Sequence, residues 1–238
     1  MCYRYSISSK PEVLEKKFSA TFTQPFTPKY HVFAFSEQKL PVITNKNPDK
    51  IQLFSWGLIP FWTKDNTQAK IIQKQTANAR VETIYEKPAF RHAAKQHHCL
   101  ILADGFFEWR QYKDLKYPYY IYLKNREPFA FAGVWDEWED KQNTQIIYSF
   151  SILTTTANQL LEKIHNTKKR MPVILSVKNQ PVWLSHSFKK QDIHHLIENN
   201  DELSIQAHTI SRLINSKTNN DTNADIVTPY TYETLPSI

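Results

Sequence analysis

The stretch HCLILADGFFEW (98–109) decides the fold class of this chain. It is rich in aliphatic and aromatic residues, and three comparable runs follow it, namely YPYYIYL (117–123), FAFAGVW (129–135) and IIYSFSILTTT (146–156). Runs of this composition, broken by polar turns, predict β-strands. Because strand follows strand more often than strand alternates with helix, we predict an α+β fold with a mostly antiparallel, barrel-like β core flanked by short helices.

Shorter elements are predicted on both sides of these four runs. Further strands are expected at 31–35, 41–44, 51–56 and 171–175. Helices are expected at 9–18, with a serine cap, at 80–96, with an interruption at Pro88, and at 158–165 and 189–199. The chain has no repeat and no linker, so residues 1–238 are predicted to form a single domain, with a polar surface loop at 216–228 before the last residues to 238.

Composition narrows the class of protein. The chain has 238 residues, of which 41% are hydrophobic and 13% aromatic, which is typical of a globular protein with a substantial core. Its net charge of +7 favours an acidic partner, nucleic acid first and a membrane surface second, although a solvated lysine-rich surface explains the charge as well. Two cysteines exclude a disulfide framework and suit a reducing compartment. With no membrane-spanning run and no signal region, we expect a cytoplasmic protein.

Glycine is scarce. Average usage of roughly 7% would give about 17 glycines in a chain of this length, and only Gly57, Gly105 and Gly133 are present. Glycine is needed where the backbone takes a positive φ or where another group approaches closely. We therefore expect special backbone geometry at these three positions.

Cys2 directly follows Met1. If Met1 is removed, Cys2 carries an α-amine with a pKa of about 8 beside a thiol with a pKa of about 8.5. Such an aminothiol reacts with an aldehyde: the amine forms an imine, and the thiol then closes a five-membered thiazolidine ring with the large advantage of an intramolecular reaction. The alternative is an arbitrary second residue on a mobile terminus.

Two internal motifs carry further candidates. TANARVET (76–83) places Asn78 and Arg80 two residues apart, so in an extended segment they share a face and offer an amide and a phosphate-binding guanidinium. Alternatively, Asn78 caps a helix. Glu108 lies in an aromatic run, where a carboxyl group tends to have the raised pKa that a general acid or base needs, unless it lies on the wet face of a strand.

Histidines and the second cysteine complete the candidates. His165 closes the predicted helix 158–165, where it is either a partner of the helix dipole or a proton donor to a leaving oxygen. The pairs His97–His98 and His194–His195 have no second cluster at metal-ligand spacing and are interpreted as surface residues. Cys99 is interpreted as a buried strand thiol.

Seven motifs occur together in one order: MC-x-R, WG-x-x-P-x-W, NAR-x-E, ADGFFEW, AG-x-W, LTT and IH…RMP. In this order and at these separations they resemble the SOS-response-associated peptidase (SRAP) domain, whose members crosslink covalently to abasic sites in single-stranded DNA. The resemblance extends from Cys2 to about Pro172 and continues through HTISRLIN (208–215).

The resemblance implies a role for each matching residue. The implied catalytic residues are Cys2, the nucleophile, with Asn78, Glu108 and His165. The implied DNA-binding residues, in a basic cleft, are Arg4, Arg80 and Arg170 on phosphates, Trp62 on a base and Thr154 lining the site. Three features depart from the family pattern. Tyr3 replaces a common glycine, and YHVFAF (30–35) has His31 and Phe35 in place of an Asn-x-x-Pro-like stretch, so no role is assigned to these two residues. The stretch IHNTKKRMP is longer between His165 and Arg170, with two added lysines.

The resemblance predicts a DNA-damage protein that shields abasic sites by a thiazolidine crosslink. Its expected partner is single-stranded DNA containing abasic sites; we expect a monomer that needs no cofactor, metal or membrane and is nucleoid-associated when bound to DNA. Two alternatives remain open. One is an N-terminal-nucleophile cysteine peptidase that processes itself at Met1. The other is a noncatalytic single-strand-binding module, which would bind intact and abasic strands alike.

Overall fold

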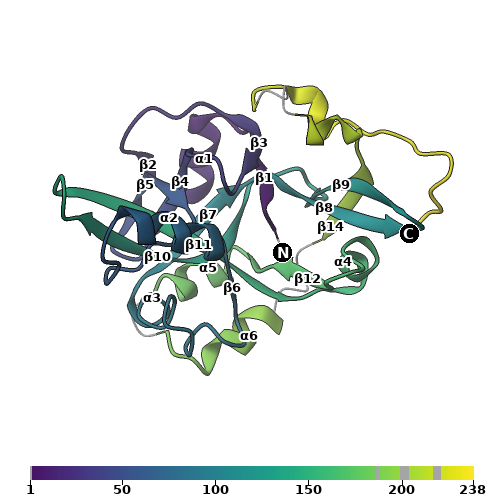
Figure 1. The fold of residues 1–238 in the computed structure, drawn as a ribbon. Coiled ribbons are helices and arrows are strands. Elements are labelled where there is room, and N and C mark those ends of the chain that lie inside the picture. Colours follow the sequence, from purple (N-terminus) through teal and green to yellow (C-terminus); the bar gives the residue numbers. More distant parts are fainter. Residues whose placement is uncertain (1, 186–187, 199–203, 217–220) are drawn as a thin grey trace.

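A closed β-barrel forms the centre of the molecule. The structure, a computed structural model, describes residues 2–185, 188–198, 204–216 and 221–238. The barrel strands are β4 (Lys39–Thr44), β5 (Asn47–Trp56), β7 (His98–Ala103), β10 (Phe129–Asp140) and β11 (Gln145–Thr156) (Figure 1). They pair antiparallel in the order β5-β4-β7-β10-β11, and a parallel pairing of β11 with β5 closes the circuit. The predicted barrel-like α+β fold is confirmed.

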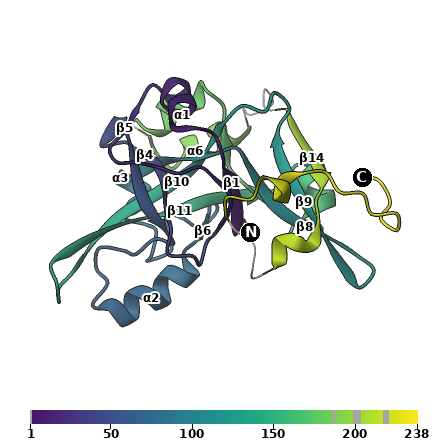
Figure 2. The ribbon, with the colours of Figure 1, turned by 90° about the horizontal axis from the view of Figure 1, so that it is seen from above.

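A second sheet packs beside the barrel. Its strand order is β14-β9-β8-β1-β3, and the strands are β1 (Arg4–Ile7), β3 (Lys29–Phe33), β8 (Gly105–Tyr112), β9 (Leu115–Leu123) and β14 (Ile205–Thr209). Strand β1 lies between β3 and β8, and both pairings are antiparallel. Figure 2 shows β8, β9 and β14 together on one side of β1. Strand β1 is therefore held on both sides, and the carbonyl of Tyr3 just before it accepts a hydrogen bond from the N–H of Ala34, which fixes the backbone next to Cys2.

The predicted run 98–109 is two strands that turn from the barrel into the second sheet at Asp104. The half-buried carboxylate of Asp104 accepts hydrogen bonds from the backbone N–H groups of Ser8 and Ser9, at 2.5 and 2.9 Å. From β1, the ring of Tyr5 packs against Trp56 and Phe131 of the barrel, with centroids 5.2 and 5.9 Å apart. These contacts join the two sheets in one core.

Short helices and strands complete the fold. The helices are α1 (Pro11–Phe18), α2 (Asn66–Gln75), α3 (Ala93–Gln96), α4 (Gln159–Ile164), α5 (Asn179–Trp183) and α6 (Asp192–Glu198), with 3₁₀ turns η1 (Arg212–Asn215) and η2 (Ala224–Val227). The short strands are β2 (Thr21–Phe22), β6 (Asn78–Arg80), β12 (Arg170–Pro172) and β13 (Ile174–Leu175). Among the described residues, none of the helices has the length and apolar character to span a membrane.

Two sequence-based helix predictions need correction. The predicted helix 80–96 is helical only at α3, because Asn78–Arg80 pairs with β11 and the N–H of Val81 bonds to the carbonyl of Thr154, which commits this backbone to the sheet. The predicted serine cap of α1 is wrong as well, since Lys10 holds the cap position and the Ser9 hydroxyl donates to Asp104 instead. Residue 199 of the predicted helix 189–199, and residues 217–220 of the predicted loop, lie outside the described residues.

Two of the three glycines show why no side chain is tolerated. Gly57 has a φ of +101°, which other residues rarely adopt, and a Cβ there would lie 2.4 Å from the carbonyl oxygen of Gln73. At Gly133 on β10, a Cβ would lie 2.0 Å from Cδ1 of Ile101 and 2.9 Å from the carbonyl oxygen of Ser151. At Gly133 a larger residue is excluded by steric clash, because a core side chain and the backbone of the neighbouring strand already fill the space beside its Cα.

Gly133→Val is therefore expected to lower the free energy of unfolding by about 3 kcal/mol, the upper range for overpacking a filled core. Urea unfolding followed by circular dichroism measures the change. The matched control is Glu137→Val on the same strand, whose side chain is exposed and whose substitution should shift stability by no more than about 0.5 kcal/mol. Equal unfolding midpoints for the two variants would contradict this account of the barrel.

Candidate functional site

A pocket of about 700 Å³ opens beside β1, β3, β8 and the segment between α4 and β12. Its lining includes five residues that the sequence singled out: Arg4, Arg80, Glu108, His165 and Arg170. It also includes four aromatic residues and two lysines that were not among the predicted site residues: Tyr3, Phe33, Phe35, Trp109, Lys116 and Lys168. The pocket is thus both basic and aromatic.

Cys2 is fully buried just behind this lining. Its Sγ lies 3.5 Å from the carbonyl oxygen of Arg4, and its own carbonyl accepts a 2.8 Å hydrogen bond from Nδ2 of Asn78. Burial raises the pKa of the Cys2 thiol, and the nearby carboxyl group of Glu108 raises it further. The alternative of a residue on a mobile terminus does not fit, because Cys2 is a held, protonated thiol.

Glu108 and His165 face each other at the pocket. Glu108 Oε2 lies 3.7 Å from His165 Nε2, and both side chains are almost fully buried. Burial raises the pKa of Glu108 to about 8, so its carboxyl group keeps a proton at neutral pH. The alternative of a glutamate on a wet strand face is therefore wrong.

His165 is held as a neutral base. It directly follows α4, and its Nδ1 donates to the carbonyl oxygen of Arg170 at 2.8 Å, which places the ring proton on Nδ1. Burial lowers the pKa of His165, so Nε2 is unprotonated and points toward Glu108. The pair consequently holds one transferable proton, carried by the carboxyl group.

Asn78 lies on β6, so the extended interpretation of TANARVET holds and the helix-cap interpretation is wrong. Its Nδ2 holds the backbone of Cys2, as described above. Its Oδ1 is buried and has no hydrogen-bond partner among the described residues. One acceptor is thus available close to the backbone of Cys2, while Arg80, two residues on, reaches the pocket with an exposed side chain.

Arg4 is fixed across one side of the pocket. Its guanidinium lies 4.9 Å from the ring centre of Phe33 and 5.4 Å from that of Trp109. Its Nη1 donates to the carbonyl oxygen of Ile214 at 2.7 Å and lies 3.3 Å from Nε2 of His31. Burial, together with Arg4, lowers the pKa of His31 to about 4, so the imidazole is neutral and accepts that hydrogen bond.

The remaining predicted DNA contacts have different surroundings. Arg170 forms an ion pair with Glu82 and donates to the carbonyl oxygen of Thr154 at 2.6 Å. Thr154 is fully buried and lies outside the pocket lining, where its hydroxyl faces Arg170 and the carbonyl of Ala79. Trp62 is 42% exposed but also lies outside the lining. Of the three predicted arginines, only Arg80 has an exposed side chain at the pocket.

The interpretation of His97 and His98 as surface residues is wrong. Both are buried, since they connect α3 to β7 against the barrel, and the ring of His97 stacks on Trp135 with centroids 4.6 Å apart. His194 is exposed on α6, as predicted, while the side chain of His195 lies outside the described residues. Cys99 is a buried strand thiol, as predicted, and burial raises its pKa well above the usual range.

The barrel and the pocket define a class of protein: α+β proteins with a basic, aromatic-lined pocket beside β1, the inner strand by which the chain enters the second sheet. The chain belongs to the SOS response associated peptidase (SRAP) family, whose model matches residues 1–217. The resemblance read from the motifs is thereby confirmed.

Individual relatives agree with this assignment. The chain is 35% identical over 225 residues to the abasic site processing protein YoqW of Bacillus subtilis (strain 168), covering 92% of this chain and 96% of that protein. It is 32% identical over 194 residues to the abasic site processing protein HMCES of Rattus norvegicus, covering 69% of this chain and 53% of that longer protein. A crystal structure of a Bacteroides thetaiotaomicron protein matches with a TM-score of 0.89 and 34% identity, covering 97% of this chain and all of the other.

Proposed function

We propose that this protein processes abasic sites in single-stranded DNA by covalent capture through Cys2. The names of its relatives, abasic site processing proteins, support the substrate. The chemistry is carried by one observation: a buried Cys2 thiol lies under the influence of Glu108, a carboxyl group that burial keeps protonated at neutral pH. A neutral thiol beside a proton donor suits condensation with an aldehyde better than thiolate attack on a peptide.

The first step is opening of the deoxyribose ring. An abasic sugar is mostly a closed hemiacetal, so its C1′–O4′ bond must break before an aldehyde exists. Glu108 gives its proton to O4′ as that bond breaks, and the C1′ hydroxyl loses its proton to His165 Nε2, the neutral base beside Glu108. Ring opening thus consumes no net proton, and the pair is restored when His165 returns the proton to Glu108.

The second step is capture of the aldehyde. With Met1 removed, the α-amine of Cys2 attacks the aldehyde carbon and, after loss of one water, forms an imine. The Cys2 sulfur then adds to the imine carbon while the thiol proton passes to the nitrogen, which closes the thiazolidine. Asn78 supports this geometry because its Nδ2 holds the Cys2 carbonyl and its buried Oδ1 is free to accept a hydrogen bond from the amine.

The pocket also suits a DNA strand. Arg80, Lys116 and Lys168 offer positive charge to phosphates, and Phe35, which is 46% exposed, offers a face on which a base stacks in any sequence context. Arg170 serves differently in this proposal: its ion pair with Glu82 and its bond to Thr154 fix β12, and with it the carbonyl that orients His165.

Peptide mapping of the adduct tests the proposal. The protein is mixed with a single-stranded oligonucleotide carrying one abasic site, and the intact mass is compared with that of the protein mixed with the undamaged strand. We expect an adduct with the abasic strand alone, with the added mass on the peptide that begins at Cys2. Borohydride should leave its yield unchanged, because a closed thiazolidine contains no imine to reduce. An adduct that maps to a lysine, or that requires borohydride, would overturn the proposal.

A further inference from the structure

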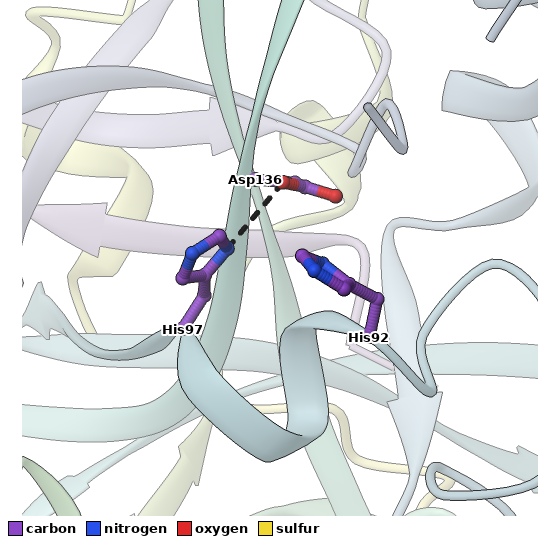
Figure 3. Close-up of side chains that lie close together, drawn as sticks. All are labelled: His92, His97 and Asp136. Carbon is purple, nitrogen blue, oxygen red and sulfur yellow. Dashed lines mark ion pairs between the residues drawn. The ribbon is translucent and has the colours of Figure 1, made fainter. Parts of the chain in front are cut away.

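A second cluster of reactive side chains lies away from the pocket. His92 and His97 flank the short helix α3, and Asp136 lies on the barrel strand β10 (Figure 3). One ring nitrogen of each histidine and one carboxylate oxygen of Asp136 all lie within 4.8 Å of one another. None of these three residues lines the 700 Å³ pocket. From this cluster we propose that the protein binds one zinc ion through His92, His97 and Asp136.

The hydrogen bonding of these three side chains fits a bound metal ion better than a proton shared between His97 and Asp136. His97 Nδ1 lies 3.4 Å from Asp136 Oδ1, and His97 Nδ1 and His92 Nδ1 are both buried with no hydrogen-bond partner among the described residues. Buried polar atoms are nearly always paired, so two unpaired imidazole nitrogens beside one buried carboxylate point to a missing partner. The side chain of His97 is 9% exposed and that of Asp136 2%.

The spacing and ligand types fit zinc. Two ligands of a tetrahedral zinc ion, each about 2.1 Å from the metal, lie about 3.4 Å apart, which is the separation of His97 Nδ1 and Asp136 Oδ1. His92 is only half-buried, at the cap of a four-residue helix, so its side chain has room to move inward. Two imidazoles and a carboxylate are a common zinc ligand set, with water in the fourth position.

The surroundings hold these ligands in place. The two oxygens of Asp136 accept hydrogen bonds from the backbone N–H groups of Phe61, at 3.1 Å, and Glu137, at 3.0 Å. The ring of His97 stacks on Trp135, and the ring of His92 lies against Phe61 with centroids 4.5 Å apart. Such second contacts orient metal ligands.

The centre therefore ties three parts of the chain together: the turn that carries Phe61 and Trp62, helix α3, and the barrel strand β10. Both side chains of that turn are exposed, 52% for Phe61 and 42% for Trp62. A zinc ion at this place therefore fixes the base of an exposed aromatic turn. Sequence reasoning missed this site because the two histidines are five residues apart and Asp136 follows 39 positions later.

Zinc counting tests the proposal in a Cys2→Ala background, which removes the aminothiol, itself a potential zinc ligand. Protein stripped with a chelator is dialysed against zinc, and bound metal is measured per chain. We expect one equivalent in the background protein and in its His194→Ala derivative, which loses an exposed histidine elsewhere, and none in its His92→Ala derivative. Asp136→Asn, which keeps the shape of the side chain, should also lose the metal if His92→Ala is poorly folded.

Thermal unfolding gives a second readout. Zinc at a hundredfold excess over its dissociation constant should raise the melting temperature of the background protein by roughly 5–10 °C, while magnesium should not. His92→Ala should show no zinc-dependent rise. Equal zinc content in the background, His92→Ala and Asp136→Asn proteins would overturn the proposal, and so would zinc that is bound only when Cys2 is present.

Discussion

Cys2→Ala is expected to abolish covalent capture of abasic DNA. The variant keeps an α-amine after Met1 removal and still forms an imine, but it has no sulfur to close the ring, and an open imine hydrolyses. Intramolecular ring closure carries a large kinetic advantage, so accumulation of the adduct should slow by roughly a thousandfold or more. Denaturing gels of a time course with an abasic single strand measure this rate.

The controls separate chemistry from binding and from folding. Cys99→Ala removes the other buried thiol and should crosslink at the wild-type rate. Affinity of Cys2→Ala for an undamaged single strand, measured by fluorescence anisotropy, should stay within about twofold of wild type, because the pocket cations are untouched. If Cys2→Ala still forms a stable adduct, the nucleophile is a different residue; if undamaged strands bind it far more weakly, its defect is structural.

Glu108→Gln is expected to slow crosslinking by about 10²- to 10⁴-fold, the usual contribution of a general acid. Glutamine keeps the shape of the side chain but has no acidic proton for the ring oxygen. The pH profile identifies the role. In the wild type the rate should rise as the α-amine deprotonates and fall again as Glu108 loses its proton near its pKa of about 8. The variant should lose the falling limb and keep the rising one.

Stability distinguishes this result from misfolding. In the folded protein Glu108 keeps its proton up to a pH of about 8, whereas in the unfolded chain it has the ordinary pKa of 4.5. Between these two pH values the folded state binds more protons than the unfolded state, so the free energy of unfolding falls as the pH rises. Glu108→Gln removes this loss and should be at least as stable as wild type at pH 8. The exposed Glu137→Gln is the matched control for both measurements. A Glu108→Gln protein with an unaltered crosslinking profile would exclude the general-acid role.

The strands of the barrel could be predicted from the sequence because each of them is a local signal. The runs at 129–135 and 146–156 carry β-branched and aromatic residues that satisfy strand geometry without knowledge of their neighbours. What closes the barrel is the parallel pairing of β11 with β5, nearly a hundred residues apart, and no local pattern encodes it. Existence of the strands was therefore predictable, while their closure was not.

The site shows the same division. Glu108 was recognisable because its aromatic neighbours are adjacent in sequence and predict its burial. Phe33 and Phe35 join the pocket only through the pairing of β3 with β1, so their place in it could not be read from the chain. The ion pair of Arg170 with Glu82 spans 88 positions, so no local motif could reveal this partner of an arginine that the resemblance assigns to DNA. The burial of His97 likewise depends on how α3 meets the barrel.

The inner position of β1, between β3 and β8, also sets an order of events during biosynthesis. Its residues leave the ribosome about a hundred positions before Phe106 and Gly105, the partners on one side of the strand. Until that far stretch has been translated, the peptide bond ahead of Cys2 belongs to an unanchored, accessible segment. Trimming of Met1 by an aminopeptidase, which the proposed function requires, therefore has its natural opportunity on the nascent chain, before the sheet assembles around Cys2.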